Sequence, residues 1–274
     1  MKAFYFPEKI EIKNPTIIMG SFDAIHIGHL ELIKKAQSLN EPIIMMMFEK
    51  PYELPNKSRE MFEQLEVRLQ KLSNMDIDYA MVVKVDSHLL TMLPEDFMKE
   101  LKETYSPANI VCGKDFSFGR GGAGNPDLLA KVFGEVHVVD MKKIANKNIS
   151  TSIIKEQIPF GEIDFANSLL VAPWTTNIKI GKESEFVLEE VQIKPHSGFY
   201  AVTAINNDVM YHGVVHVTRQ GKNIIHLLNN SENLQNKDFS ISWWRQLEIT
   251  IKDQGDELRD EHLEVANRFF KNSL

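Results

Sequence analysis

The chain of 274 residues is poor in cysteine, in long apolar runs and in positive charge, and each shortage argues against a class of protein. A single cysteine, Cys112, allows no intramolecular disulfide and no cysteine-based metal cage, which favours a reducing compartment. No apolar run approaches the roughly 18 residues that a membrane span requires, and the first residues lack the apolar core of a signal peptide. The formal charge of −7 argues against a general nucleic-acid binder, because binding to the phosphate backbone needs clustered cations. The sequence therefore predicts a cytoplasmic protein with no membrane or nucleic-acid partner, and it leaves the oligomeric state open.

The pattern of the chain changes near residue 160. Before that point strand-like and helix-like segments alternate, and continuous apolar strands are typical of a parallel sheet covered on both faces. The strands expected there are residues 16–19, 43–48, 80–85, 110–112 and 136–140, and the helices are 29–39, 59–72, 94–103, 126–132 and 150–157. Later, short strand-like segments are separated by Asn, Asp and Gly turns, and an amphipathic helix over 256–271 closes the chain. The predicted fold class is α/β: a Rossmann-like parallel-sheet domain over 1–160, followed by a small antiparallel β-barrel domain with a C-terminal helix over 161–274.

The most informative segment is residues 20–29, which follows an apolar strand and opens a helical pattern. It places His26 and His29 on the predicted first turn of a helix, with Gly28 between them. Helix N-termini bind phosphate because their free N–H groups and dipole attract anions, and imidazoles can donate hydrogen bonds to phosphate oxygens. The segment therefore predicts a nucleotide phosphate site. Asp23 either caps the helix or orients a ligand group or a metal.

Two further segments carry candidate ligand groups. Residues 111–120 begin where a predicted strand ends, and Phe116 and Phe118 either wall a flat aromatic ligand or fill the core. Residues 119–124 match G-x-G-x-x-G, but they do not follow the strand directly, so we interpret them as a loop over a ligand rather than a dinucleotide site. Ser150, Thr151 and Lys155 gather hydroxyls and one cation at a predicted helix start, which suits a triphosphate or, more simply, helix capping.

Residues 20–29, 113–119 and 149–155, in this order, resemble the FMN adenylyltransferase module of bacterial bifunctional riboflavin kinase/FAD synthetases. The corresponding family patterns are G-x-F-D-G-x-H-x-G-H, G-x-D-F-x-F-G and I-S-S-T-x-I-R. The chain departs from them at Ala24, which replaces a glycine, at Lys155, which replaces an arginine, and at Lys50-Pro51, where the family tends to have His-Pro.

The resemblance implies transfer of AMP from ATP to FMN, giving FAD and pyrophosphate, with Mg²⁺ as cofactor and with metal ligands unknown. It implies catalytic roles for His26, His29 and Lys155 and flavin binding by Asp115, Phe116 and Phe118. The residues that it assigns to ATP are Gly20, Ser21, Phe22, Asp23, His26, Gly28, His29, Ser150, Thr151 and Lys155.

The second half resembles the riboflavin kinase module of the same family but lacks part of its chemistry. Thr175 and Asn177 stand where that module holds Mg-nucleotide, while the Gly/Arg-rich loop before them is missing. Ile224 stands where the family has its catalytic glutamate, and isoleucine cannot act as a general base. We therefore expect an inactive, kinase-like barrel retained for packing, oligomer contacts or flavin sensing. Two alternatives stay open: a bifunctional riboflavin kinase/FAD synthetase, and a non-catalytic flavin-binding regulatory protein.

Overall fold

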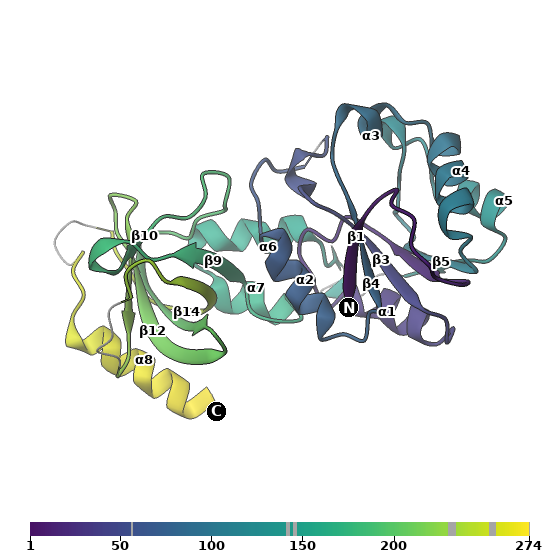
Figure 1. Cartoon of the computed structure of the whole chain (residues 1–274). Coiled ribbons are helices and arrows are strands. Elements are labelled where there is room, and N and C mark those ends of the chain that lie inside the picture. The colour runs from purple at the N-terminus through teal and green to yellow at the C-terminus, as the bar shows by residue number, and fades with distance from the viewer. Residues whose placement is uncertain (56, 141–142, 145–146, 230–233, 252–255, 274) are drawn as a thin grey trace. The chain divides into compact units, whose positions relative to one another are not determined.

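The computed structural model describes all residues except 56, 141–142, 145–146, 230–233, 252–255 and 274. The chain forms two compact units (Figure 1). The first unit comprises Met1–Met61 and Arg68–Thr151, and the second comprises Phe62–Val67 and Ser152–Leu274. A short stretch of the N-terminal half therefore belongs to the second unit. Within the described part of the chain, no helix has the length and apolar character needed to cross a membrane.

The first unit is built on a six-stranded parallel sheet with the order β1-β4-β3-β2-β5-β6. Its strands are β1 (Lys2–Tyr5), β2 (Thr16–Met19), β3 (Ile43–Phe48), β4 (Tyr79–Val83), β5 (Asn109–Gly113) and β6 (Val136–Val139). The chain runs from β2 to β3 and β4 on one side and then returns to β5 on the other side of β2. At such a switch point open α/β sheets form a ligand crevice beyond the carboxyl ends of their strands.

Helices cover both faces of this sheet because its inner strands are continuous apolar runs, whose successive side chains point to opposite faces. On one face α4 (Pro94–Tyr105) and α5 (Pro126–Phe133) join a core cluster that includes Ile17, Met46, Phe97, Leu101 and Leu129. Helix α1 (Leu30–Gln37), which buries three apolar side chains, lies on the opposite side (Figure 1). The remaining helices of this unit are short, and they include α3 (Ser87–Thr91) and most of α2 (Leu65–Ser73).

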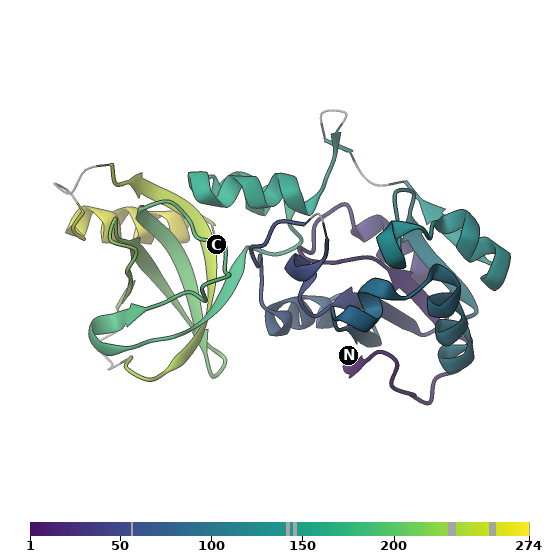
Figure 2. The same cartoon turned by 90° about the horizontal axis from the view of Figure 1, so that it is seen from above.

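The second unit is a curved antiparallel sheet with the order β10-β13-β12-β11-β14-β9 (Figure 2). The strands are β9 (Thr175–Lys179), β10 (Glu185–Phe186), β11 (Gly198–Asn206), β12 (Val209–Val217), β13 (Asn223–Leu227) and β14 (Asp238–Ile249). Among the described residues β9 and β10 remain edges, so the predicted barrel is an open one. Helix α8 (Asp260–Ser273) closes a small core through Ala266, which packs with Phe199 and Val214. Helices α6 (Thr151–Gln157) and α7 (Ile163–Leu169) precede the sheet.

Residues just before α2 bind the edge strand β9 of the second unit. The indole Nε1 of Trp174 donates to the carbonyl of Phe62 at 2.8 Å. The Gln64 amide accepts from the backbone N–H of Asn177 at 3.2 Å and donates to its carbonyl at 3.0 Å. The helix expected from residue 59 begins only at Leu65, and the carbonyl of Phe62 before it accepts from the Trp174 indole instead of from a helical turn.

The predicted fold class is confirmed, because a parallel-sheet α/β unit is followed by an antiparallel sheet with a C-terminal helix. The ends of the predicted elements differ by a few residues from those in the structure. The largest difference at the C-terminus is the start of α8, which is Asp260 rather than residue 256.

Candidate active site

The segment after β2 turns sharply before α1 begins. Phe22 has a φ of 44°, in the left-handed region that bulky residues rarely adopt. Gly20 has no room for a side chain, since a Cβ there would lie 2.7 Å from the Phe22 ring. The expectation that both histidines lie on the first helical turn is wrong: α1 begins at Leu30, and His29 is its N-cap. His26 lies in the preceding turn, and its backbone carbonyl accepts a hydrogen bond from the backbone N–H of His29 at 2.9 Å. Because the N-cap is His29, Asp23 does not cap this helix.

The two histidine rings form a stack at the start of α1. Their centroids are 3.6 Å apart with an interplanar angle of 14°, and the Phe22 ring lies 4.7 Å from that of His29. Nδ1 of His29 accepts the backbone N–H of His26 at 3.3 Å, so in the neutral ring the proton is on Nε2. His26 is 2% exposed, and its buried Nδ1 has no hydrogen-bond partner in the described part of the chain. A buried polar atom without a protein partner is uncommon and favours a role toward a ligand.

Burial makes both histidines poor bases. Because burial removes water from the charged ring, the pKa of His26 falls from 6.5 to about 4. Burial also holds the pKa of His29 well below 6.5, and the neighbouring charge of His26 lowers it further. Both rings are therefore neutral near pH 7, and each neutral ring still carries one N–H donor. The sequence left their protonation open, and the structure assigns the neutral form.

A cleft of about 540 Å³ lies at the carboxyl ends of the central strands. This volume is typical of a site for a small molecule. Its apolar lining comes from the ends of β3 and β4, from α3 and from the start of α4: Met46, Phe48, Val83, Leu89, Leu90, Met92 and Phe97. Ser21 of the first motif and Asp115, Phe116 and Phe118 of the second line this one cleft, whereas His26 and His29 are not among its lining residues.

The two phenylalanines of the second motif have different environments. Their rings stack with centroids 5.7 Å apart and an interplanar angle of 17°. Phe118 is only 8% exposed and packs on Phe97 in the core, whereas Phe116 is half-buried and Asp115 is exposed. Phe118 therefore fills the core, while Phe116 packs partly against the core and lines the cleft; its contact with a flat aromatic ligand stays a prediction.

The glycine-rich segment after Phe118 also borders the cleft, with Gly119, Gly121 and Gly122 among its lining residues. Gly119 has a φ of 72°, and a Cβ there would lie 2.8 Å from the backbone nitrogen of Pro94. The segment forms a short turn beside the ligand crevice. A dinucleotide fingerprint would have to follow a strand directly, and this segment does not.

The third motif divides between the two units. Ser150 is half-buried just before α6, and Ser150 and Thr151 belong to the first unit with the histidines. Lys155 is buried and belongs to the second unit. A shared role of these three residues at a triphosphate stays a prediction.

Sequence reasoning missed part of the cleft wall. Leu54, Pro55 and Lys57 line it, as do Leu89 and Leu90 of α3. One signal in the sequence could have indicated these wall residues: Leu54, Pro55 and Lys57 come shortly after the end of an apolar strand and beyond Lys50-Pro51.

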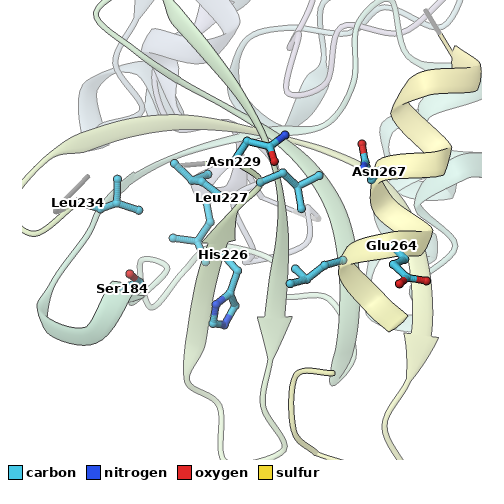
Figure 3. Close-up of a pocket in the computed structure, with 10 residues that line it drawn as sticks. Ser184, His226, Leu227, Asn229, Leu234, Glu264 and Asn267 are labelled. Carbon is cyan, nitrogen blue, oxygen red and sulfur yellow. The ribbon is translucent and has the colours of Figure 1, made fainter. Parts of the chain in front are cut away.

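The second unit has a smaller pocket of about 450 Å³ between β13 and α8 (Figure 3). Its polar lining residues include His226 of β13, Asn229 just after it, and Glu264 and Asn267 of α8. Burial lowers the pKa of His226, and the charge of His216 lowers it further.

A parallel α/β sheet with a neutral histidine pair and an apolar cleft at one edge defines the class as nucleotidyltransferase-like, joined here to an open antiparallel barrel. The family model for FAD synthetase matches residues 9–153, which is more than half of the chain. The chain therefore belongs to the FAD synthetase family.

Curated relatives extend this similarity to nearly the whole chain. A bifunctional riboflavin kinase/FMN adenylyltransferase of Bacillus subtilis is 24% identical over 96% of this chain and 95% of its own length. A protein of the same name from Listeria monocytogenes is 24% identical over 89% of this chain and 87% of its own length. A second Listeria monocytogenes protein, named FAD synthetase, is 26% identical over 74% of this chain and 83% of its own.

The crystal structure of a protein named a macrolide-efflux protein, from Streptococcus pneumoniae, has the same fold. It superposes with a TM-score of 0.83 over 99% of both chains at 19% identity.

Proposed function

We propose that the protein is an FMN adenylyltransferase, which transfers AMP from ATP to the phosphate of FMN. A phosphate oxygen of FMN attacks the α-phosphorus of ATP, the bond from that phosphorus to the bridging oxygen breaks, and pyrophosphate leaves. No enzyme nucleophile is needed, so the protein has to position two anionic substrates and stabilise charge. The observation that carries the proposal is that Ser21 of the first motif and Asp115, Phe116 and Phe118 of the second motif line one cleft.

The histidine pair would act as neutral hydrogen-bond donors to the phosphates. His29 offers Nε2–H, because its Nδ1 is already an acceptor. Donors that are already oriented before charge develops are efficient, since they need little reorganisation during the reaction. Ser150, Thr151 and Lys155 would bind the triphosphate. The half-buried ring of Phe116 would face the flavin in a largely apolar cleft.

The donor set of the described residues fits Mg²⁺ better than a metal that requires a protein cage. No cluster of three or more His, Cys, Asp or Glu side chains suited to a metal occurs in the described ranges. Mg²⁺ is usually held by one or two carboxylates together with substrate phosphates. Asp23 of the first motif and Asp115 at the cleft are the carboxylates that would contact it. When bound, Mg²⁺ would neutralise charge on the phosphates.

We also propose that residues 1–160 carry this activity and that the barrel of residues 161–274 has no kinase activity. Ile224 lies in β13 opposite Glu185 and His216, and it supplies no base. The groups of Thr175 that would meet a nucleotide are already bonded: its N–H donates to Glu63 at 2.9 Å, and its hydroxyl donates to the Pro173 carbonyl at 2.9 Å. These contacts support a structural role for β9.

The test is chromatography of the products formed from Mg-ATP with either FMN or riboflavin. We expect FAD and pyrophosphate from FMN and no flavin product from riboflavin. FMN and FAD from riboflavin would show a bifunctional enzyme and refute the inactive barrel. No product from either substrate, together with flavin binding measured by fluorescence quenching, would replace the enzyme with a flavin-binding regulatory protein.

A further inference from the structure

Arg68 of α2 is a buried cation that joins two loops at the carboxyl edge of the sheet. Its Nη1 donates to the carbonyl of Phe22 at 3.3 Å and to the carbonyl of Phe48 at 2.8 Å. Its Nη2 donates to the carbonyl of Glu49 at 2.6 Å. The side chain is 1% exposed, and all four residues belong to the first unit.

The three acceptors belong to the two segments that border the candidate site. Phe22 is the residue of the histidine loop with a left-handed backbone, and its ring packs on His29. Phe48 lines the cleft at the end of β3, and Glu49 begins the segment that leads to Leu54, Pro55 and Lys57 in the cleft wall. One side chain therefore fixes the distance between the histidine loop and the β3 side of the cleft.

This arrangement requires the shape of arginine and not only its charge. A guanidinium presents several N–H donors in a rigid plane, so it can bond three carbonyls on two loops at once. An ammonium group is a compact charge on a flexible stem and cannot hold the same three acceptors in a fixed plane. The backbone of Phe22 also needs support, because a bulky residue adopts a positive φ only where surrounding contacts enforce it.

We propose that Arg68 is a positioning residue for adenylyl transfer, whose guanidinium holds the phosphate-binding histidine loop in place against the β3 side of the cleft. Its catalytic consequence rests on the proposed function. Its structural consequence is the burial of the histidine pair, which can be measured without any turnover.

The test compares Arg68→Lys with a matched control, Gln70→Ala, which changes an exposed side chain of the same helix. The first readout is the pH titration of the His26 and His29 ring protons by NMR. In the wild type and in Gln70→Ala, we expect His26 to titrate near pH 4, because burial lowers the pKa of its ring. In Arg68→Lys the loop opens to water, and we expect the pKa of His26 to rise toward 6.5.

The second readout is steady-state formation of FAD. We expect kcat of Arg68→Lys to fall roughly 10- to 100-fold, because small displacements of positioned groups cost about this much. KM for each substrate should change by less than roughly threefold, because Arg68 is 1% exposed and is not among the residues that line the cleft. An unchanged His26 titration, or a kcat that falls only in proportion to the folded fraction, would overturn the proposal.

Two further outcomes keep the proposal testable. If Arg68→Lys does not fold, the wild-type guanidinium is examined by ¹⁵N NMR: slow rotation of its Nη groups supports the three-carbonyl clamp, and free rotation refutes it. If the wild type forms no FAD, the proposed function fails, while the histidine titration still decides the positioning role.

Discussion

Burial of His26 predicts that the first unit loses stability in mild acid. The pKa of His26 is about 4 in the folded protein and 6.5 when the ring is exposed to water. Between these values the unfolded chain binds a proton that the folded chain does not, so stability falls as the pH falls from 6.5 toward 4. For this one group the loss is about 2 kcal/mol at about pH 5 and a little over 3 kcal/mol below pH 4. His29 acts in the same direction, since its pKa is also lowered.

The chain contains separate reporters for its two units. Cys112, the single cysteine, is fully buried in the central strand β5, and burial raises the pKa of its thiol to about 11. The thiol therefore reacts only when the first unit opens. The three tryptophans, Trp174, Trp243 and Trp244, all belong to the second unit and report its unfolding by fluorescence. Separate reporters matter because a chain with two units need not unfold in one step.

The assay is urea unfolding at about pH 7.5 and about pH 5, with a short pulse of a dithiodipyridine reagent that still labels thiols in acid. His26→Gln is the matched variant, because glutamine keeps hydrogen-bonding groups but does not titrate. We expect the wild type to lose about 2 kcal/mol more than His26→Gln between the two pH values. Equal losses in the two proteins would show that His26 is not held neutral by burial, and the argument for neutral donors would fail.

Three other predictions concern single positions. His29→Ala should lower kcat for FAD formation about 100- to 1000-fold in steady-state assays, as loss of an oriented donor does. His29→Gln should recover part of this activity, because the glutamine amide can replace Nε2–H. Equal rates for the two variants would contradict the donor role. Gly20→Ala should destabilise the first unit by about 1–3 kcal/mol in the Cys112 labelling assay, because the new Cβ meets the buried Phe22 ring; an unchanged midpoint would mean that this ring moves freely. Ile224→Glu should not create riboflavin kinase activity, since Thr175 stays bonded within its own unit; FMN formed from riboflavin would refute this.

The sheet of the first unit could be predicted because its strands are short, continuous apolar runs. Residues 43–48 are the clearest case, and they form β3 over the same range. β1 was missed although Ala3, Phe4 and Tyr5 are apolar or aromatic, because the strand has only four residues and Pro7 follows closely. β14 was missed although Phe239, Ile241 and Trp243 alternate in burial along its first half. That period-two pattern was available in the sequence and would have identified the strand.

The candidate site was predictable where it depends on strand ends and less so where it depends on packing. The motifs after β2 and β5 meet at one cleft because parallel neighbouring strands end at the same edge. The other wall residues carry no motif and reach the cleft only through the folded arrangement of their segments: Leu54, Pro55, Lys57, Leu89 and Leu90. Arg68 was overlooked because an arginine on a predicted amphipathic helix is expected to be solvent-exposed. Its three carbonyl partners are also distant in the sequence, at 19, 20 and 46 residues.

The contacts at the start of β9 bear on the proposal that the second unit has no kinase activity. Trp174 is fully buried, stacks on Trp243 with centroids 5.1 Å apart, and donates its N–H to Phe62. A loop that binds Mg-nucleotide must leave polar groups open to the ligand, whereas a buried indole with a bonded N–H is a core residue. The residues that follow it have their backbone groups bonded to Glu63 and Gln64. Restoring a base at Ile224 alone would therefore not open these bonded groups to a nucleotide, and this supports the proposal that the barrel has a structural rather than a catalytic role.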